Sequence, residues 1–492
     1  MKEYRKAKNI ILLMILVCVI SVTGCGKTAR VQATAAEPEF TIRVPLIIDQ
    51  EQEDFPMIQE EFSKIVQEKL GLSAELVYIN MSSKRNLIRM YRKERNGFDL
   101  INFQLVGDDM YQENELRPLD DLLADYGEGI LQLFSAEELE KGKRDGKIVW
   151  IPVRSDTVEG TCIMMRKDLL DAAGLSVRQR MSLSEVEEIF EIIAKENPKI
   201  KIVAPEGLHL NFLYRYYTWT NLVGSAIVAM DYGRSDQAEV LYETEEYYDL
   251  VSHFYDWRQK GWLPDYLGHI ASSSLVKNGE LFSYFVHYKP GIELQEGRQC
   301  GQEMQAVQIT DCSVQGDRQF QSVGWAITGD SEHPREAMQI LNLMYTDEEV
   351  MNLLHYGIEG VHYERNEDNR IVLKEESGYR MNSGWSLPNE FICLKRESDP
   401  DDLWAMIQEN NESAVCGAAV GFIFDSSGWE DEFSQIEKIE SVYADGLASG
   451  ALDPDIYLPV MRKEFEDAGV DLLLEEVQRQ YDQWLSQKER GE

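Results

Sequence analysis

Thr41-Ile-Arg-Val-Pro-Leu-Ile-Ile48 begins the folded part of this chain, and two similar apolar stretches follow it, Ala74-Glu-Leu-Val-Tyr-Ile79 and Phe98-Asp-Leu-Ile-Asn-Phe103. All three are rich in β-branched and aromatic residues, which favour strands. Residues 55–70 and 82–95 carry helical patterns between them. Strand, helix, strand, helix and strand in this order predict parallel winding and an α/β lobe, whose crevice lies beyond the carboxyl ends of its strands.

Further along the chain the same kind of pattern resumes. Residues 147–153 predict a single strand, and a second α/β unit is expected from residue 155 on, with strands at 160–166 and 200–204. The last 75 residues carry helical patterns over 434–449 and 460–488, separated by a turn at Gly450-Ala-Leu-Asp-Pro454. The chain therefore has enough material for two lobes with cores of their own.

The N-terminus predicts export and a lipid anchor. Four basic residues, Lys2, Arg5, Lys6 and Lys8, precede an uncharged apolar run over residues 10–22. At about 1.5 Å per residue this run is too short for a bilayer of roughly 30 Å, so it is typical of a signal peptide. Gly24-Cys25 follows and resembles a bacterial lipobox, which implies cleavage before Cys25 and acylation of its thiol. The alternative is an ordinary secretory signal.

Composition excludes several classes of partner. The chain of 492 residues has a net charge of −38, which argues against nucleic acid and anionic lipid headgroups. The seven Cys include Cys25 and show no Cys-x-x-Cys or Cys/His cluster, so we expect no metal site and no cofactor. Among the five Cys that follow Cys25, Cys300 and Cys312 form the one close pair, and the sequence leaves open whether they form a disulfide.

Several motifs, taken together, resemble the extracellular solute-binding proteins of carbohydrate ABC transporters. These are Gly146-Lys-Ile-Val-Trp-Ile-Pro152, Met165-Arg-Lys-Asp-Leu-Leu-Asp171, Trp257-Arg-Gln-Lys-Gly-Trp-Leu-Pro264, Tyr288-Lys-Pro-Gly291 and Leu354-His-Tyr-Gly-Ile-Glu-Gly-Val-His-Tyr363. The end of the chain resembles a domain named DUF3502, which occurs on solute-binding lipoproteins of Gram-positive gut bacteria. Its matching residues are Gly421-Phe-Ile-Phe-Asp425, Gly450-Ala-Leu-Asp-Pro-Asp-Ile-Tyr-Leu-Pro459 and Ala468-Gly-Val-Asp471.

The resemblance implies a two-lobed α/β fold of the periplasmic-binding-protein type II class, with a hinge and a helical C-terminal region. Its implied function is capture of an oligosaccharide or related solute by hinge closure, without chemistry, for the permease subunits of an ABC importer. We expect a monomer, held at the extracytoplasmic face of the cell membrane through its lipid only. The expected organisation is a signal peptide over 1–24, a flexible tether over 25–39, lobe 1 over 40–154, lobe 2 over 155–320, a mostly helical return to lobe 1 over 321–415, and a DUF3502-like domain over 416–486.

Sugars present apolar C–H faces and a rim of hydroxyls, which suit aromatic rings and polar side chains respectively. Trp150 and Trp325 lie on strands expected to cross between the lobes, and Trp385 lies in a loop-like stretch. For each Trp the alternative is burial in a core, and for each polar residue it is a solvated loop or an ion pair. The candidate ligand-binding residues are Trp150, Arg154, Asp156, Trp219, Asn221, Trp325, Tyr356 and Trp385.

Two other functions remain possible at this stage. One is a surface adhesin that binds glycans without transport, and the other is a secreted glycosidase, whose carboxylate pair is defined by spatial separation and not by sequence spacing. The sequence contains no His-Glu-x-x-His, no Gly-x-Ser-x-Gly and no phosphate-binding Gly-x-x-x-x-Gly-Lys motif, so no catalytic residue is predicted.

Overall fold

The computed structural model describes residues 40–48, 52–80, 97–102, 116–144, 146–158, 160–204, 218–264, 271–314, 323–381 and 383–490. The signal peptide, the lipidation residue Cys25, the tether over 25–39 and the predicted helix over 82–95 lie outside these residues. Among the described helices, none combines the length and apolar character needed to cross a bilayer.

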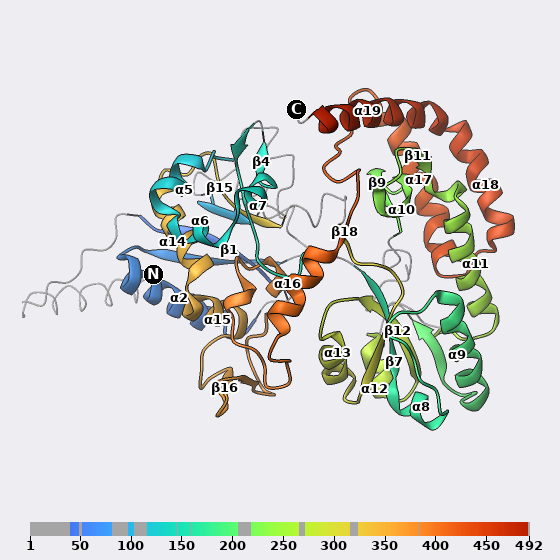
Figure 1. Ribbon diagram of the computed structural model, residues 1–492, viewed down its shortest axis with the longest axis horizontal. Helices are drawn as coiled ribbons and strands as arrows, with labels where there is room; N and C mark the ends of the chain where they lie inside the picture. Colours follow the sequence, from blue (N-terminus) through green and yellow to red (C-terminus); the bar gives the residue numbers. More distant parts are fainter. Residues whose placement is uncertain are drawn as a thin grey trace, which may run out of the picture. The chain divides into compact units, whose positions relative to one another are not determined.

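Lobe 1 is the part of the molecule that contains the sheets β1-β2 and β3-β15-β6 (Figure 1). Its strands are β1 (Ile42–Ile48), β2 (Ala74–Asn80), β3 (Leu100–Asn102), β4 (Lys143–Arg144), β5 (Lys147–Ile148), β6 (Ile151–Pro152), β15 (Gly324–Ile327), β16 (Tyr363–Arg365) and β17 (Ile371–Leu373). Its helices are α2 (Phe55–Leu70), α5 (Asp120–Tyr126), α6 (Glu128–Leu133), α7 (Ala136–Glu140), α14 (Pro334–Thr346), α15 (Glu348–Tyr356), η5 (Gly384–Ser386) and η6 (Glu390–Ile392).

The opening of lobe 1 follows the sequence closely. β1 and β2 pair in parallel, from Ile42↔Ala74 to Ile48↔Asn80, and α2 connects them as predicted. α2 ends at Gly71, whose φ of 69° is left-handed and unstrained only in glycine. The third strand differs from the prediction of purely parallel winding, because its described hydrogen-bonded partner is the antiparallel strand β15. A segment that returns late in the chain therefore completes this sheet.

The predicted single strand over 147–153 is wrong. The structure divides it into β5, which pairs with β4, and β6, which pairs with β15. Between them the backbone N–H of Val149 donates to Gly142 O at 2.9 Å, and the indole of Trp150 is buried with Ile101 and Leu116. The chain changes partner here because the indole turns into the lobe core.

Lobe 2 is the part built on a four-stranded sheet of order β13-β7-β12-β8, in which β12 pairs with β7 antiparallel and with β8 in parallel. Its strands are β7 (Thr161–Arg166), β8 (Lys201–Ala204), β9 (Thr220–Val223), β10 (Ile227–Ala229), β11 (Ala238–Val240), β12 (Leu281–His287) and β13 (Met304–Gln308). Its helices are α8 (Lys167–Ala172), α9 (Leu183–Glu196), α10 (Met230–Gly233), η4 (Leu241–Glu243), α11 (Glu245–Gln259), α12 (Ser272–Lys277) and α13 (Ile292–Cys300).

The C-terminal helices are α17 (Glu430–Ala448), α18 (Pro454–Asp467) and α19 (Val470–Arg490). The pattern over 460–488 predicted one helix there, but the chain breaks at Gly469, whose φ is 87°. α17 and α18 lie beside α11, α19 lies against β11, and all three share one hydrophobic core with lobe 2 (Figure 1). Phe465, for example, is fully buried, and its ring centroid lies 5.5 Å from that of Tyr242.

Three connecting segments join the sheets of the two lobes. The first, which we call the first crossing segment, comprises residues 153–158 between β6 and β7. The second contains β14 (Ser313–Val314), and the third contains β18 (Val415–Cys416), which follows α16 (Leu403–Ser413). β14 and β18 pair in parallel, Ser313↔Val415 and Val314↔Cys416, so the second and third connections run side by side.

The five described cysteines are free, including Cys300 and Cys312. The Sγ of Cys300 lies 3.2 Å from the hydroxyl of Tyr284, in the core beside β12, whereas Cys312 precedes β14. The two thiols therefore occupy separate environments in this structure and are not joined.

The shared core predicts that the C-terminal helices stabilise lobe 2. Replacing Phe465 with Ala should lower the free energy of unfolding by about 3–5 kcal/mol, because it removes a fully buried ring from the core. Leu472→Ala is the matched control, since this side chain is 63% exposed and its loss should change stability by no more than about 0.5 kcal/mol. Urea denaturation followed by circular dichroism measures both. Equal stabilities for the two variants would contradict a shared core.

Candidate functional site

A loop from lobe 1, residues 383–390, lies at the carboxyl ends of β1 and β3. The hydroxyl of Ser383 donates to Ile47 O at 2.8 Å, and the side-chain amide of Asn102 donates to Ser386 O at 3.0 Å. Ile47 is the last residue but one of β1 and Asn102 is the last of β3. Ligands of open α/β sheets bind beyond such strand ends. This loop, which we call the strand-end loop, therefore lies where the fold predicts a ligand crevice.

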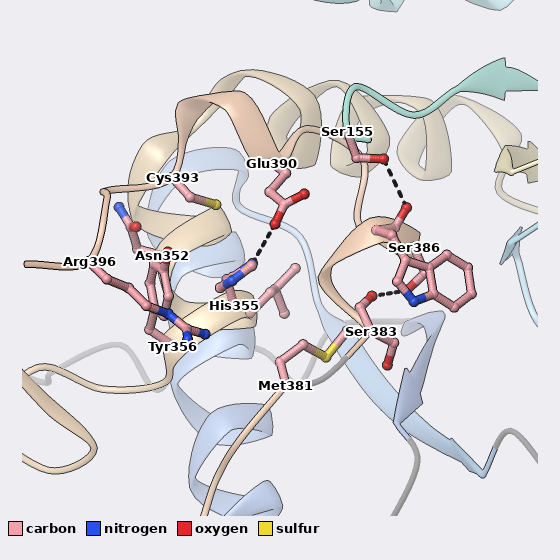
Figure 2. A network of polar contacts seen from close by, with 12 residues as sticks. Ser155, Asn352, His355, Tyr356, Met381, Ser383, Ser386, Glu390, Cys393 and Arg396 are labelled. Atoms are coloured by element: carbon pink, nitrogen blue, oxygen red, sulfur yellow. Dashed lines mark hydrogen bonds and ion pairs between the residues drawn. The ribbon is translucent and has the colours of Figure 1, made fainter. Parts of the chain in front are cut away.

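The first crossing segment is bound to the strand-end loop by backbone and side-chain hydrogen bonds. The backbone N–H of Arg154 donates to Pro388 O at 2.9 Å, and the N–H of Glu390 donates to Arg154 O at 2.8 Å. The hydroxyl of Ser155 donates to Trp385 O at 3.2 Å, one of the dashed contacts in Figure 2. These hydrogen bonds therefore fix the position of Trp385 relative to the first crossing segment.

Helix α16 holds the other side of the crossing segment through a single amide. The side-chain nitrogen of Asn411 donates to Ser155 O at 2.8 Å, while its Oδ1 accepts from the N–H of Thr157 at 3.1 Å. The Asn411 side chain thus holds the backbone on both sides of Asp156. Asp156 is thereby placed with its side chain beside lobe 2.

Asp156 lies between groups from both lobes. Its Oδ2 is 3.8 Å from Nε2 of His287 at the end of β12, and its Oδ1 is buried without a hydrogen-bond partner among the described residues. Burial raises the pKa of Asp156 to about 7, against a lowering effect from Lys289 and with a further raising effect from Glu390. The side chain is only 11% exposed, which explains why burial dominates.

A second buried group of charged residues lies at the end of α15, where Figure 2 shows His355 and Glu390 facing each other. His355 Nδ1 lies 4.0 Å from Glu390 Oε1, too far for a hydrogen bond. Burial, with the nearby cations Arg396 and Lys289, lowers the pKa of His355 to about 3. Burial also raises the pKa of Glu390. His355 is therefore neutral at physiological pH.

Tyr356, a predicted ligand-binding residue, belongs to the same group. Its hydroxyl donates to Leu394 O at 2.7 Å, and the guanidinium of Arg396 lies 5.9 Å from its ring centroid. Its ring also contacts His355 at a centroid distance of 4.2 Å. Tyr356 is 4% exposed, so it packs among these residues, and its prediction as a ligand contact stays untested.

The structure places the four predicted tryptophans in two different environments. Trp150 and Trp325 are each 1% exposed and Trp219 is 6% exposed, which is the packing alternative for a tryptophan. Trp150 and Trp325 lie within lobe 1 and not on crossing strands, so that expectation is wrong: the crossing begins only after β6. Trp385, on the strand-end loop, is the half-buried one of the four.

Arg154, Asp156 and Trp385 come together around the first crossing segment and the strand-end loop, whereas Tyr356 packs against His355 and Leu394. Trp219 and Asn221 lie instead on or next to β9, in the three-stranded sheet β11-β10-β9 of lobe 2. Asn221 Oδ1 is buried and without a hydrogen-bond partner in the described part of the chain. Its prediction as a ligand contact, like those of the other candidates, stays a prediction.

Sequence reasoning missed several residues of this site. They come from elements far apart in the chain, so no local spacing could reveal them: His287, Lys289, Glu390, Arg396 and Asn411. The one available signal was the run Tyr288-Lys-Pro-Gly291, which contains Lys289. Among the described residues, no group of three or more His, Cys, Asp or Glu side chains is arranged to hold a metal ion.

Chemically, the arrangement places the half-buried indole of Trp385 near buried polar atoms that can accept hydrogen bonds. Asp156 Oδ1, Asn389 Oδ1 and His355 Nδ1 are buried without hydrogen-bond partners in the described part of the molecule. Such atoms destabilise a folded protein unless water or a ligand satisfies them. The site is therefore suited to an uncharged ligand with an apolar face and several hydroxyl donors.

Comparison with known proteins places the chain in a structural context. Residues 418–486 match the family model described as "Domain of unknown function (DUF3502)". A "Carbohydrate ABC transporter substrate-binding protein" of Streptococcus pneumoniae serotype 4 is 22% identical over 444 residues, which cover 87% of each chain.

The fold is that of two-lobed solute-binding proteins. The crystal structure of the "N-glycan transport solute binding protein (NgtS)" from Streptococcus pneumoniae superposes with a TM-score of 0.80 at 20% identity, over 92% of this chain and 100% of that one. The same protein in complex with Man1GlcNAc gives 0.72 at 20% identity, over 91% and 99%. The S. pneumoniae protein FusA in complex with kestose gives 0.60 at 14% identity, over 91% and 100%.

The environment of Asp156 predicts a pH-dependent contribution to stability. Because the folded carboxyl has a pKa of about 7 and the unfolded one about 4, the folded state binds this proton more tightly. The stabilising contribution is full below pH 4 and is lost as the pH rises through 7. The free energy of unfolding of Asp156→Asn, measured relative to that of the wild type, should therefore increase by roughly 2 kcal/mol when the pH is raised from 5 to 8.

Chemical denaturation at both pH values measures this difference. Glu239→Gln is the matched control, because Glu239 is an exposed carboxylate on β11 and its replacement should shift stability equally at both pH values. A difference between Asp156→Asn and the wild type that does not change with pH would show that Asp156 is not buried as described.

Proposed function

We propose that this protein captures an oligosaccharide between its two lobes and delivers it unchanged to an ABC importer. The observation that carries the proposal is the joining of Trp385 to the first crossing segment, at the carboxyl ends of the lobe 1 strands. An indole face there covers the C–H face of a sugar ring, and the unpartnered polar atoms around it accept its hydroxyl hydrogens. The carbohydrate-binding relatives support the ligand class.

Capture by closure follows from how the lobes are connected. β14 and β18 lie side by side, and the first crossing segment is held by both the strand-end loop and α16. A few connecting residues of this kind can absorb the backbone rotations of a hinge while the sheets move as rigid bodies. We infer that the closed, loaded form is the one that the permease subunits recognise, and that the protein works as a monomer.

The two carboxyls of the site support binding and not hydrolysis. A glycosidase needs one ionised carboxylate and one protonated carboxyl on either side of the scissile bond. Here burial raises the pKa of both Asp156 and Glu390. Burial thus favours the protonated form of each carboxyl, and neither is held in the ionised form that the base or nucleophile of a glycosidase needs.

The N-terminal segment supports a lipid anchor at the outer face of the cell membrane. Residues 10–22 followed by Gly24-Cys25 have the order of a lipoprotein signal. Acylation of Cys25 with two lipid chains would give the stable anchoring that a single chain does not. The acidic composition, with a net charge of −38, favours attachment through lipid and not through basic residues.

Glycan binding is the first test of this proposal. Isothermal titration with Man5GlcNAc and a panel of neutral oligosaccharides should give saturable binding to the wild type. Trp385→Ala should weaken that binding about tenfold or more, because it removes the exposed ring face on which a sugar stacks. Trp429→Ala, a half-buried tryptophan beside the C-terminal helices, should leave the affinity unchanged. A wild type that binds no sugar in the panel would overturn the carbohydrate assignment.

Lipidation is tested separately in cells. With the full chain expressed in a Gram-positive host, labelled palmitate should be incorporated into the wild type, and the protein should sediment with membranes. Cys25→Ser should abolish labelling and leave the precursor unprocessed, because the acceptor thiol is missing. Cys18→Ser is the matched control, since Cys18 lies within the apolar run and should not affect labelling. Equal labelling of the wild type and Cys25→Ser would rule out this anchor.

A further inference from the structure

A separate cavity of about 590 Å³ adjoins the candidate site formed by the strand-end loop, the first crossing segment and the residues around Tyr356, which we call the strand-end site. The two share the stretch that follows η6: Leu394 lines the cavity, and its carbonyl accepts the Tyr356 hydroxyl at 2.7 Å. The volume lies within the range of pockets that hold small organic ligands. Its lining residues are Asp368, Asn369, Arg370, Cys393, Leu394, Lys395, Asp401 and Trp404.

One wall of the cavity is aromatic. Trp404, in the first turn of α16, donates its indole N–H to Cys393 O at 3.1 Å, and its ring is tilted against that of Phe391 at a centroid distance of 5.9 Å. Because the backbone satisfies the only polar atom of this indole, the ring can offer a ligand its apolar face alone. Trp404 is half-buried, and Leu394 beside it is half-buried as well.

A polar turn with a fixed conformation also lines the cavity. Asp368 and Asn369 lie in the connection between β16 and β17, and both are exposed. The side-chain oxygen of Asn366 accepts from the N–H groups of Asp368 and Arg370, at 3.1 and 2.9 Å. Asn369 has a left-handed φ of 59°. The two polar side chains are therefore presented by a rigid turn.

The cavity lining contains two acidic and two basic residues, Asp368, Asp401, Arg370 and Lys395. Arg370 donates to Arg396 O at 3.1 Å and to Asp399 O at 2.6 Å, and it forms an ion pair with Asp401. Lys395 donates to the backbone carbonyl of Asp401. With two bases bound and two acids in the lining, the cavity has no excess positive charge for an anion. An aromatic wall and a neutral polar rim instead suit the two faces of a sugar ring.

We propose that this cavity is an accessory saccharide subsite, in which the Trp404 ring and the Asp368–Asn369 turn hold a neutral outer sugar residue of a larger oligosaccharide. The inference rests on the proposed function, because the inner part of the same glycan occupies the strand-end site. Segment 393–396 separates the two sites and contacts both, so a branched or extended chain bridges them, whereas a disaccharide fills only the first.

Two glycans of different size test the subsite. Isothermal titration of the full-length mature protein with Man5GlcNAc and Man1GlcNAc should show that Trp404→Ala weakens the larger glycan about fivefold to tenfold and leaves the smaller one within about twofold. Trp404→Phe should recover most of the affinity, since it keeps a ring face. Asn369→Gly should also weaken the larger glycan selectively, and it keeps the turn because glycine accepts the positive φ.

The controls separate the possible outcomes. Glu409→Gln, an exposed change on the same helix, should bind both glycans like the wild type. If Trp404→Ala binds Man5GlcNAc like the wild type, or weakens both glycans by the same factor, the accessory subsite is overturned while the proposed function stands. If the wild type binds neither glycan, the proposed function and the subsite fall together. Circular dichroism of each variant confirms that a loss of binding is not a loss of fold.

Discussion

The pairing of Arg154 with the strand-end loop is the interaction on which the candidate site depends. Two backbone hydrogen bonds, from Arg154 N–H to Pro388 O and from Glu390 N–H to Arg154 O, join a connection between the lobes to a loop more than 200 residues later. Because they are main-chain bonds, they fix the register of both segments whatever side chains the segments carry. Trp385 and Asp156 therefore keep their separation only while this short pairing persists, and any hinge rotation must occur beyond it.

Electrostatics makes the site depend on both lobes. Asp156 lies on the connection, Lys289 comes from the end of lobe 2 that carries β12, and Glu390 and Arg396 come from lobe 1. Each of these charges is partly buried, and a buried charge is stable only near a partner of opposite sign. Lys289 reduces the cost of burying Asp156 and Glu390 at once. If a movement of lobe 2 withdrew Lys289, Asp156 and Glu390 would be stable only when protonated or when accepting hydrogen bonds from a ligand. The position of lobe 2 is therefore coupled to occupancy of the candidate site.

The sequence predicted local structure well and side-chain environments less well, for physical reasons. β1, α2 and β2 were predicted with nearly their observed bounds, because a strand or an amphipathic helix is encoded in consecutive residues. The break at Trp150 was missed because it results from burial against Ile101 and Leu116, which no neighbouring residue encodes. Three of four candidate tryptophans lie in cores for the same reason, whereas Trp385, chosen for its loop-like surroundings, is half-buried and its role stays a prediction. Asp156 was named as a candidate, but its neighbour His287 follows 131 positions later, and no signal in the sequence indicated it.

The C-terminal helices complete lobe 2, and this limits what their function can be. The side chain of Gln478 accepts from Ala238 N–H at 2.6 Å, and Arg258 donates to Ser449 O at 2.7 Å, so α19 and α17 are bound to the sheet and helix that they cover. Elements that share a core with lobe 2 must move with it as one body. β18 leads into these helices directly from its pairing with β14. A rotation at that pairing would therefore carry the whole DUF3502-like region. Its outer surface follows the position of lobe 2, and through it the arrangement of the candidate site.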